Sequence, residues 1–494
     1  MGTIRRQSIQ ATMIMAIGVL LGFVLKLFVF TAYLTTEEIG LLTVLLDAAN
    51  LFAAFIPLGG QSIFVKYMPH FKEKSQKSPS GLLFLGSMLA LIGFLFFTLV
   101  FFLFRDSIVA FYADQAPLFS KYIFYLLPLV AFRVIYTVSQ SYSWALKKNI
   151  FPLFIKDIIV RLLTGIVVLA FAWHWFDIDG LVFWFVAIYF ISGSILTFYL
   201  FRGGVLNLER PINKLGNGKG KEIFFFGMFA IMTSAGGIII RNIDSLMITS
   251  LVDLKATGIY SIAFFIGQII ELPRRAVGQI TAPFVAEASA KDDKKQIAVL
   301  FQKTAINQFL VGSLLLVCVW TNIDSLLQVI PNGEDYISGK YVVLFIGLGK
   351  LFDMSMGINS NIIQHSKHYR FNFYTMSIMG VLGIATNLLL IPQLGINGAA
   401  IASLITIFLA NVMKGVFLAA KFKLQPFNKD FIAAMILSVV AYIIAFFLPS
   451  LDNPMADIIY RSGVTIISFG ALIIVFRVSS DVNALINGLM QKLK

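Results

Sequence analysis

Long apolar segments recur from one end of this chain to the other, and they constrain its fold more than any other feature. About 20 apolar residues in a helix cross the hydrocarbon core of a bilayer. Charged residues make up only 13% of the 494 residues and hydrophobic residues 58%, whereas soluble domains carry about 25% charged residues. The sequence therefore predicts an all-α polytopic membrane protein with about 14 transmembrane helices. The expected spans are 9–34, 39–58, 81–104, 122–145, 153–175, 181–201, 223–250, 258–285, 298–321, 341–364, 372–392, 398–420, 431–449 and 458–477.

The short loops between these segments alternate in charge. Lys and Arg gather in every second loop, and Glu or Asp occupy the loops between them, for example at Glu37, Asp177 and Asp457. Basic loops stay in the cytoplasm, so topology explains the net charge of +14 without a nucleic-acid partner. We expect a multi-pass protein of the cytoplasmic (inner) membrane with both termini in the cytoplasm. The loops are too short for a catalytic domain, so we do not expect an enzyme.

The chain repeats itself at an offset of 218 residues. Gly40 in "YLTTEEIGLL" matches Gly258 in "SLVDLKATGIYS", and Gly180 in "FDIDGLV" matches Gly398 in "LGINGAA". Asp106-Ser107 and Asp324-Ser325 have the same offset. We therefore expect two pseudo-symmetric six-helix bundles, followed by two C-terminal helices. The expected parts are an N-terminal bundle at 1–205, a cytoplasmic linker at 206–222, a C-terminal bundle at 223–422, two extra transmembrane helices at 423–478 and an amphipathic cytoplasmic tail at 479–494.

Three stretches of the sequence are similar to a known transporter family. "AYLTTEEIGLLTVLLDAANLFAAFIPLGG", "ATGIYSIAFFIGQIIELP" and "IPQLGINGAAIASLI" resemble segments of the polysaccharide-biosynthesis, O-antigen (Wzx-type) flippases. These belong to the multidrug/oligosaccharidyl-lipid/polysaccharide (MOP) exporter superfamily. The resemblance implies alternating-access export of a polyprenyl-pyrophosphate-linked oligosaccharide, such as an O-antigen unit of lipopolysaccharide or a capsule or exopolysaccharide unit. It also implies a membrane-lipid environment and a polysaccharide polymerase as a partner.

We expect thirteen of the charged residues to lie inside the membrane. Such residues usually face a bundle interior or a water-filled cavity. Asp157–Arg161, Arg241–Asp244, Lys350–Asp353 and Glu271 with Arg274 or Arg275 have the spacing of helical neighbours, so mutual pairing is an alternative to a binding role. The cations are Lys26, Arg133, Arg161, Arg241, Arg274, Arg275, Lys350 and Lys414, and the anions are Asp47, Asp157, Asp244, Glu271 and Asp353.

The cations outnumber the anions, which suits an anionic cargo. Arg meets phosphate with paired hydrogen bonds and Lys with a point charge. We expect Lys26 to line the outer half of a cationic cavity, although a contact with Asp47 could also explain it. Lys414 is expected to snorkel to the cytoplasmic surface. The predicted substrate-binding residues are Lys26, Arg133, Arg241, Arg274, Arg275 and Lys350.

The acidic residues suggest coupling of transport to an ion. A carboxylate in a cavity of low dielectric can bind and release H⁺ or Na⁺, and the candidates are Asp47, Asp244, Glu271 and Asp353. We expect no other cofactor and no metal site. Pro273 should interrupt the hydrogen bonds of span 258–285.

Two other cargoes and one other class of protein fit parts of the pattern. A multidrug exporter would share the fold, but Lys26 stands in a first span without an acidic residue, which argues against cationic cargo. A lipid II flippase would carry the same pyrophosphate and polyprenyl groups. A membrane scaffold that transports nothing would not need a surplus of intramembrane cations.

Overall fold

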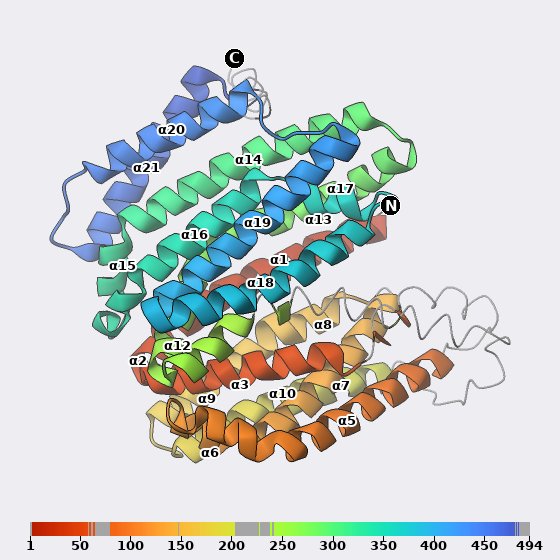
Figure 1. The fold of residues 1–494 in the computed structure, drawn as a ribbon. Coiled ribbons are helices and arrows are strands. Elements are labelled where there is room, and N and C mark those ends of the chain that lie inside the picture. The colour runs from red at the N-terminus through yellow and green to blue at the C-terminus, as the bar shows by residue number, and fades with distance from the viewer. Residues whose placement is uncertain are drawn as a thin grey trace. The chain divides into compact units, whose positions relative to one another are not determined.

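The computed structural model describes residues 2–57, 59–60, 63–64, 80–146, 148–202, 227, 238–239, 242–479, 481 and 483. Every regular element among them is helical (Figure 1), and 11 of the described helices are long and apolar enough to cross a membrane. The prediction of an all-α polytopic membrane protein is confirmed. Two compact units, residues 1–258 and 259–494, divide the chain. The predicted linker at 206–222 and most of the tail at 479–494 lie outside the described residues.

The first unit is a bundle in which α7 packs against both α3 and α10. Its first and fifth predicted spans each change from α-helix to π-helix and back. Residues 242–250 are also helical. The elements are α1 (Gly2–Val24), η1 (Leu25–Phe30), α2 (Thr31–Tyr33), α3 (Thr36–Phe55), α5 (Ser80–Ala113), α6 (Pro117–Tyr122), η2 (Ile123–Tyr125), α7 (Leu126–Ala145), α8 (Ile150–Phe154), η3 (Ile155–Ile159), α9 (Val160–Ala172), α10 (Ile178–Arg202) and the start of α12 (Leu254–Gln268).

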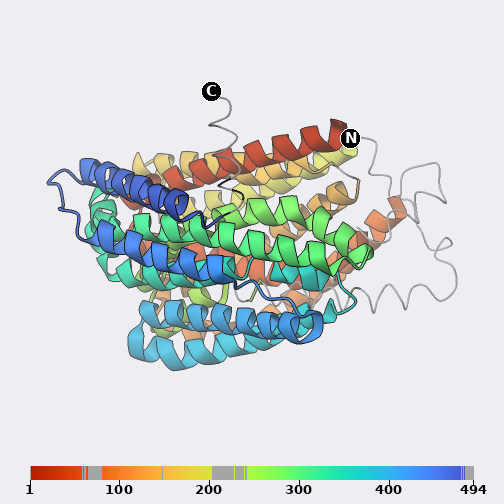
Figure 2. The ribbon, with the colours of Figure 1, turned by 90° about the horizontal axis from the view of Figure 1, so that it is seen from above.

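In the second unit, α14, α16, α19 and α18 pack in that order, each against the next. Figures 1 and 2 both show these green-to-blue helices running alongside one another. The elements after α12 are η4 (Ile269–Glu271), α13 (Leu272–Ala290), α14 (Lys294–Thr321), α15 (Ile323–Val329), η5 (Gly333–Gly339), α16 (Lys340–Ser355), α17 (Asn359–Gln364), α18 (Arg370–Leu394), α19 (Ile396–Phe422), α20 (Lys429–Phe446) and α21 (Pro454–Phe476).

Three predicted spans differ from a simple apolar helix. Span 153–175 contains the π-helical segment η3 and carries Lys156, Asp157 and Arg161. Span 341–364 is not continuous: α16 ends before Gly357, whose φ of 50° no regular helix allows, and α17 begins after it. Most of span 223–250 lies outside the described residues.

The two extra helices, α20 and α21, pack on α14. Their shared core contains Phe309, Phe431 and Phe469, and Ser438 donates a hydrogen bond to Ser313 at 2.9 Å. The opposite face of α21 is apolar and exposed, with Ile467 at 73%. Such a face is stable against lipid and not against water.

Asp457 was expected in a loop, and the structure places it in a helix instead. It lies in the first turn of α21 and is 1% exposed. It accepts hydrogen bonds from Ser325 and Arg461, at 2.6 and 3.1 Å. Arg461, which we had not counted among the intramembrane charges, also donates to the carbonyl oxygen of Thr321. This pair joins α21 to α14 and α15.

The repeated motif "YLTTEEIGLL" is a helix cap with a counterpart 218 residues later. Thr35 and Glu38 form a capping box at the start of α3, in which each side chain binds the other residue's backbone N–H. At the matching positions, Asp253 accepts a hydrogen bond from the backbone N–H of Ala256 at the start of α12. Caps of this kind satisfy the free N–H groups of a helix terminus. Repetition of the motif thus reflects repetition of a helix start.

The glycines of this motif allow two backbones of the first unit to touch. A Cβ on Gly40 would overlap the carbonyl oxygen of Leu254, and a Cβ on Gly258 would overlap that of Thr36. Thr36 and Leu254 are themselves 218 residues apart. The contact between α3 and the start of α12 is therefore reciprocal, because each glycine approaches the residue that matches, 218 positions away, the residue approached by the other glycine.

We predict that Gly258→Ala lowers the stability of the protein by roughly 2–3 kcal/mol, because the new methyl group meets backbone that cannot move aside. Gly463→Ala in α21 is the matched control, since a Cβ at Gly463 has nothing within 4 Å. That variant should keep or raise stability. Thermal unfolding of the two variants in detergent measures the difference, and equal melting temperatures would contradict the close crossing.

Candidate functional site

The described residues predicted for the site form two clusters, one inside each unit. The first contains Lys26, Asp47 and Asp244, with Arg133 on α7, and includes two neighbouring charges that were not predicted for the site, Asp157 and Arg161. The second contains Glu271, Arg274, Lys350 and Asp353. Arg241 lies outside the described residues, as does the side chain of Arg275.

Two π-helical segments hold charged residues of the first cluster. Lys26 lies in η1 and Asp157 in η3. A π-helix inserts an extra residue into an α-helix and turns the following side chains to a new direction, often at functional sites. The hydroxyl of Thr31 donates to the carbonyl oxygen of Leu27 in the first segment. η3 packs against α1, and η1 packs against α9.

Two glycines of α1 provide the room for this packing. Gly18 faces Asp157 in η3, and Gly22 faces Arg161 at the start of α9. The two pairs are therefore one helical turn apart on both sides of the contact. This is the small-xxx-small pattern with which membrane helices approach closely. Asp157 and Arg161 are 4.0 Å apart, at the limit of an ion pair.

The two glycines should differ in their response to a methyl group. In Gly18→Ala the Cβ would lie 2.9 Å from the backbone oxygen of Asp157, whereas in Gly22→Ala it meets the end of the Arg161 side chain. A side-chain end can turn away and backbone cannot, so we predict a loss of about 1–3 kcal/mol for Gly18→Ala and less for Gly22→Ala. Melting temperatures in detergent test the order of the two. The reverse order would show that Arg161 is the more rigid neighbour.

Two arginines of the first unit have N–H groups that are buried but without a hydrogen-bond acceptor among the described residues. These are the Nε of Arg133 and the Nη1 of Arg161. The guanidinium of Arg133 lies 5.6 Å from the centre of the Tyr189 ring. A buried donor without an acceptor is costly, by about 1–3 kcal/mol. Arg161, which the spacing had assigned to Asp157 alone, is thus a further anion-binding candidate.

Two acidic residues of the first cluster, Asp47 and Asp244, lie near one another. Ser245 donates a hydrogen bond to Asp47 at 2.6 Å, across from α3 to helix 242–250. Asp244, which directly precedes Ser245, is 5% exposed. Lys26 interacts electrostatically with Asp47 and with Arg161. Electrostatic attraction to Asp47, which is the plain explanation for Lys26, therefore contributes at this position.

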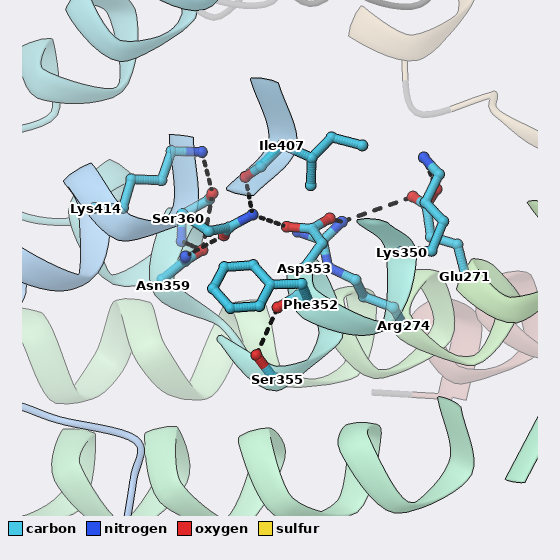
Figure 3. A network of polar contacts seen from close by, with 11 residues as sticks. Glu271, Arg274, Lys350, Phe352, Asp353, Ser355, Asn359, Ser360, Ile407 and Lys414 are labelled. Carbon is cyan, nitrogen blue, oxygen red and sulfur yellow. Dashed lines mark hydrogen bonds and ion pairs between the residues drawn. The ribbon is translucent and has the colours of Figure 1, made fainter. Parts of the chain in front are cut away.

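The second cluster pairs its charges across two helices as well as along one of them (Figure 3). Lys350 contacts Glu271 at 2.6 Å, and Arg274 contacts Asp353 at 2.7 Å. Arg274 also lies 3.6 Å from Glu271, which is the expected pair along one helix. The four side chains are between 13% and 25% exposed. They form a quartet in the order Lys350, Glu271, Arg274 and Asp353, in which Arg274 contacts two carboxylates.

A break in the helix positions this quartet. α12 ends at Gln268, the tight 3₁₀ turn η4 follows, and α13 begins with Pro273 in its first turn. The predicted interruption at Pro273 is confirmed. Gly347 on α16 leaves space for Ile270, since a Cβ there would lie 2.7 Å from its Cδ1. The close approach of η4 to α16 brings Glu271 to Lys350.

Lys414 does not snorkel to the surface as expected. It is 5% exposed, and its ammonium group donates to the hydroxyl of Ser360 at 3.0 Å. Asn359 and Asn411 lie next to it and are also buried, at 1% and 2%. Sequence reasoning missed these residues, although polar side chains in the apolar segments 341–364 and 398–420 were a visible signal.

The family of polysaccharide biosynthesis proteins matches residues 4–273 of this chain. A probable low-salt glycan biosynthesis flippase, Agl15 of Haloferax volcanii, is 20% identical over 51% of the chain and 56% of its own length. The membrane protein MJ1068 of Methanocaldococcus jannaschii is 23% identical over 47% of the chain and 46% of its own length. The chain spans about half the length of these curated relatives.

Solved transporters share the fold over most of the chain. The lipid II flippase MurJ, in an inward closed conformation, matches with a TM-score of 0.74 and 15% identity over 95% of this chain and 98% of its own. An inward-facing multidrug resistance transporter of the MATE family matches with a TM-score of 0.66 and 13% identity over 84% and 98%. The chain therefore belongs to the polysaccharide biosynthesis protein family and has the fold of the MOP superfamily transporters.

Proposed function

We propose that this protein is a flippase that moves a polyprenyl-pyrophosphate-linked oligosaccharide from the cytoplasmic to the outer leaflet of the cytoplasmic membrane by alternating access. The family match and the named glycan flippase among the relatives support a lipid-linked glycan as cargo. The alternation of basic and acidic loops supports cytoplasmic termini. A polysaccharide polymerase would then receive the glycan at the outer face.

The observation that carries the proposal is the presence of buried cations with free donors. Arg133 and Arg161 each have a buried N–H without a hydrogen-bond acceptor in the described part of the chain. Arg274 and Lys350 are held in a quartet from which they can be drawn by a stronger anion. A diphosphate supplies acceptor oxygens and negative charge for such groups. Lys26 completes the proposed set.

We also propose that an ion drives the cycle, with Asp47 and Asp244 as the first candidates for its binding. Glu271 and Asp353 are already held by Lys350 and Arg274, which favours a structural role for them. Asp47 accepts a hydrogen bond from the neutral hydroxyl of Ser245, and such a carboxylate can exchange H⁺ or Na⁺. Export measured with and without a Na⁺ gradient and a pH gradient distinguishes the two ions.

Lipid II and organic cations are the competing cargoes, because solved transporters for lipid II and for multidrug resistance share the fold. Lipid II presents the same diphosphate with a different sugar. A drug cation would meet Lys26 and the guanidinium of Arg133 as like charges. The anionic cargo is therefore favoured over the cationic one.

The test is a lipid extraction from cells without this gene, followed by mass analysis of the polyprenyl-pyrophosphate species. The proposal predicts accumulation of oligosaccharide-lipid and loss of surface glycan, both restored by the wild-type protein. An unchanged glycolipid pool together with altered sensitivity to cationic drugs would contradict it. Accumulation of lipid II alone would identify the other diphosphate cargo.

A further inference from the structure

A chain of hydrogen bonds connects Lys414 to Asp353 through three neutral side chains. Lys414 Nζ donates to Ser360 Oγ at 3.0 Å, and Ser360 Oγ donates to Asn359 Oδ1 at 3.1 Å. Asn359 Nδ2 then donates to Asn411 Oδ1 at 2.8 Å, and Asn411 Nδ2 donates to Asp353 Oδ1 at 2.9 Å. Figure 3 shows this line of contacts meeting the ion pair of Arg274 at the Asp353 carboxylate.

All links of the chain have the same direction. Each group accepts from the side of the ammonium and donates toward the carboxylate, so the dipoles align between a positive and a negative end. Hydrogen bonds arranged in this way polarise and strengthen one another in a medium of low dielectric. Asn359, Asn411 and Lys414 are at most 5% exposed, so water screens little of this effect.

The alignment gives Asp353 a second source of positive charge in addition to Arg274. Lys414 interacts electrostatically with Asp353 and with Arg274. A buried carboxylate that loses its only counter-charge costs several kcal/mol. With Lys414 behind it, Asp353 remains compensated when Arg274 turns away. The described cluster has three cations, Arg274, Lys350 and Lys414, for the two carboxylates Glu271 and Asp353.

We propose that Lys414, acting through Ser360, Asn359 and Asn411, is a reserve counter-charge for Asp353 that frees Arg274 to bind the diphosphate of the cargo. This inference rests on the proposed function, since it assumes an anionic cargo. Lys414 is a positioning residue in this scheme: it touches neither Arg274 nor the cargo and sets how easily Arg274 exchanges one partner for the other.

The break after α16 makes this arrangement possible. Gly357, with a φ of 50°, ends the helix and lets α17 begin in a new direction with Asn359 and Ser360. Asn411 and Lys414 are one turn apart on α19, so they present two contacts on the same face. The hydrogen-bond chain thus starts at Lys414 on α19, passes through α17 and returns to α19 before it reaches Asp353 on α16. All of its members belong to the second unit.

The experiment measures the affinity of the purified full-length protein in lipid nanodiscs for inorganic pyrophosphate, by titration calorimetry. Lys414→Met should weaken binding about tenfold, within the usual range of coupling between two sites. Adding Asp353→Asn removes the carboxylate that retains Arg274, and should restore the affinity of the wild type. Lys421→Met is the matched control, because Lys421 is an exposed lysine of the same helix, and it should leave the affinity unchanged.

A second variant separates the hydrogen-bond chain from net charge. Ser360→Ala keeps every charged group and removes one link, so it should also weaken binding by several-fold and give a result even where Lys414→Met does not fold. If Ser360→Ala binds pyrophosphate as tightly as the wild type, the hydrogen-bond chain has no role. Any loss of affinity in Lys414→Met would then come from the change in net charge alone. If Arg274→Gln abolishes binding while Lys414→Met does not weaken it, the reserve role fails and the proposed function stands. If the wild type does not bind pyrophosphate, both fail.

Discussion

Replacing Arg274 by Leu is expected to abolish glycan export and to destabilise the protein by roughly 3 kcal/mol, the cost of breaking a buried ion pair from one side. Arg274 contacts Asp353 at 2.7 Å and Glu271 at 3.6 Å. Its loss removes the cation in direct contact with Asp353 and one of the cations beside Glu271. Surface glycan in complemented cells and thermal unfolding of the purified protein measure the two effects.

A double variant separates stability from function. In Arg274→Leu with Asp353→Leu, the ion pair is replaced as a unit by apolar side chains, which often costs no stability, and Lys414 keeps its hydrogen bond to Ser360. The melting temperature should therefore return toward that of the wild type while export stays absent. Normal export in either variant would show that Arg274 only braces the helices.

Lys26→Glu is expected to reduce export about 100-fold or more, because like charges placed against each other cost several kcal/mol. The new carboxylate would face Asp47 and an anionic cargo in place of a cation. Lys26→Arg keeps the charge and should retain most of the activity. The readout is the amount of surface glycan at equal protein level in the membrane.

An exposed lysine provides the control for charge reversal. Lys255 lies in the first turn of α12 and is exposed, and a Glu at a helix N-terminus is favourable. Lys255→Glu should therefore leave export unchanged. If both reversals have the same effect, the loss in Lys26→Glu comes from expression or topology and not from the site.

The features of the fold that depend on local sequence were predictable. Long apolar segments located most of the helices, because a span must be apolar over about 20 residues. The repeated motifs marked helix starts, since Thr35 and Asp253 cap α3 and α12 at matching positions. Pro273 marked a break because it cannot continue the hydrogen-bond ladder of a helix.

The arrangement of the site was predictable only in part. The spacing of charges suggested pairs along one helix, but the quartet pairs Lys350 with Glu271 across two helices, and spacing within a helix carries no information on that geometry. The π-helical segment around Asp157 packs against glycines of α1, a contact between distant parts of the sequence that no local pattern reveals. Lys414 was misplaced because its partner Ser360 follows a helix break that hydropathy did not show.

The most direct measurement reconstitutes the purified protein in sealed vesicles that contain the polyprenyl-pyrophosphate-linked oligosaccharide in both leaflets. A membrane-impermeant reagent that modifies the glycan is added outside, and the modified fraction is followed with time. We predict that wild-type vesicles expose the whole pool, whereas empty vesicles and those with Arg274→Leu expose only the outer leaflet. An exposed fraction equal to that of empty vesicles, together with uptake of a cationic drug by the same wild-type preparation, would contradict the proposed flippase.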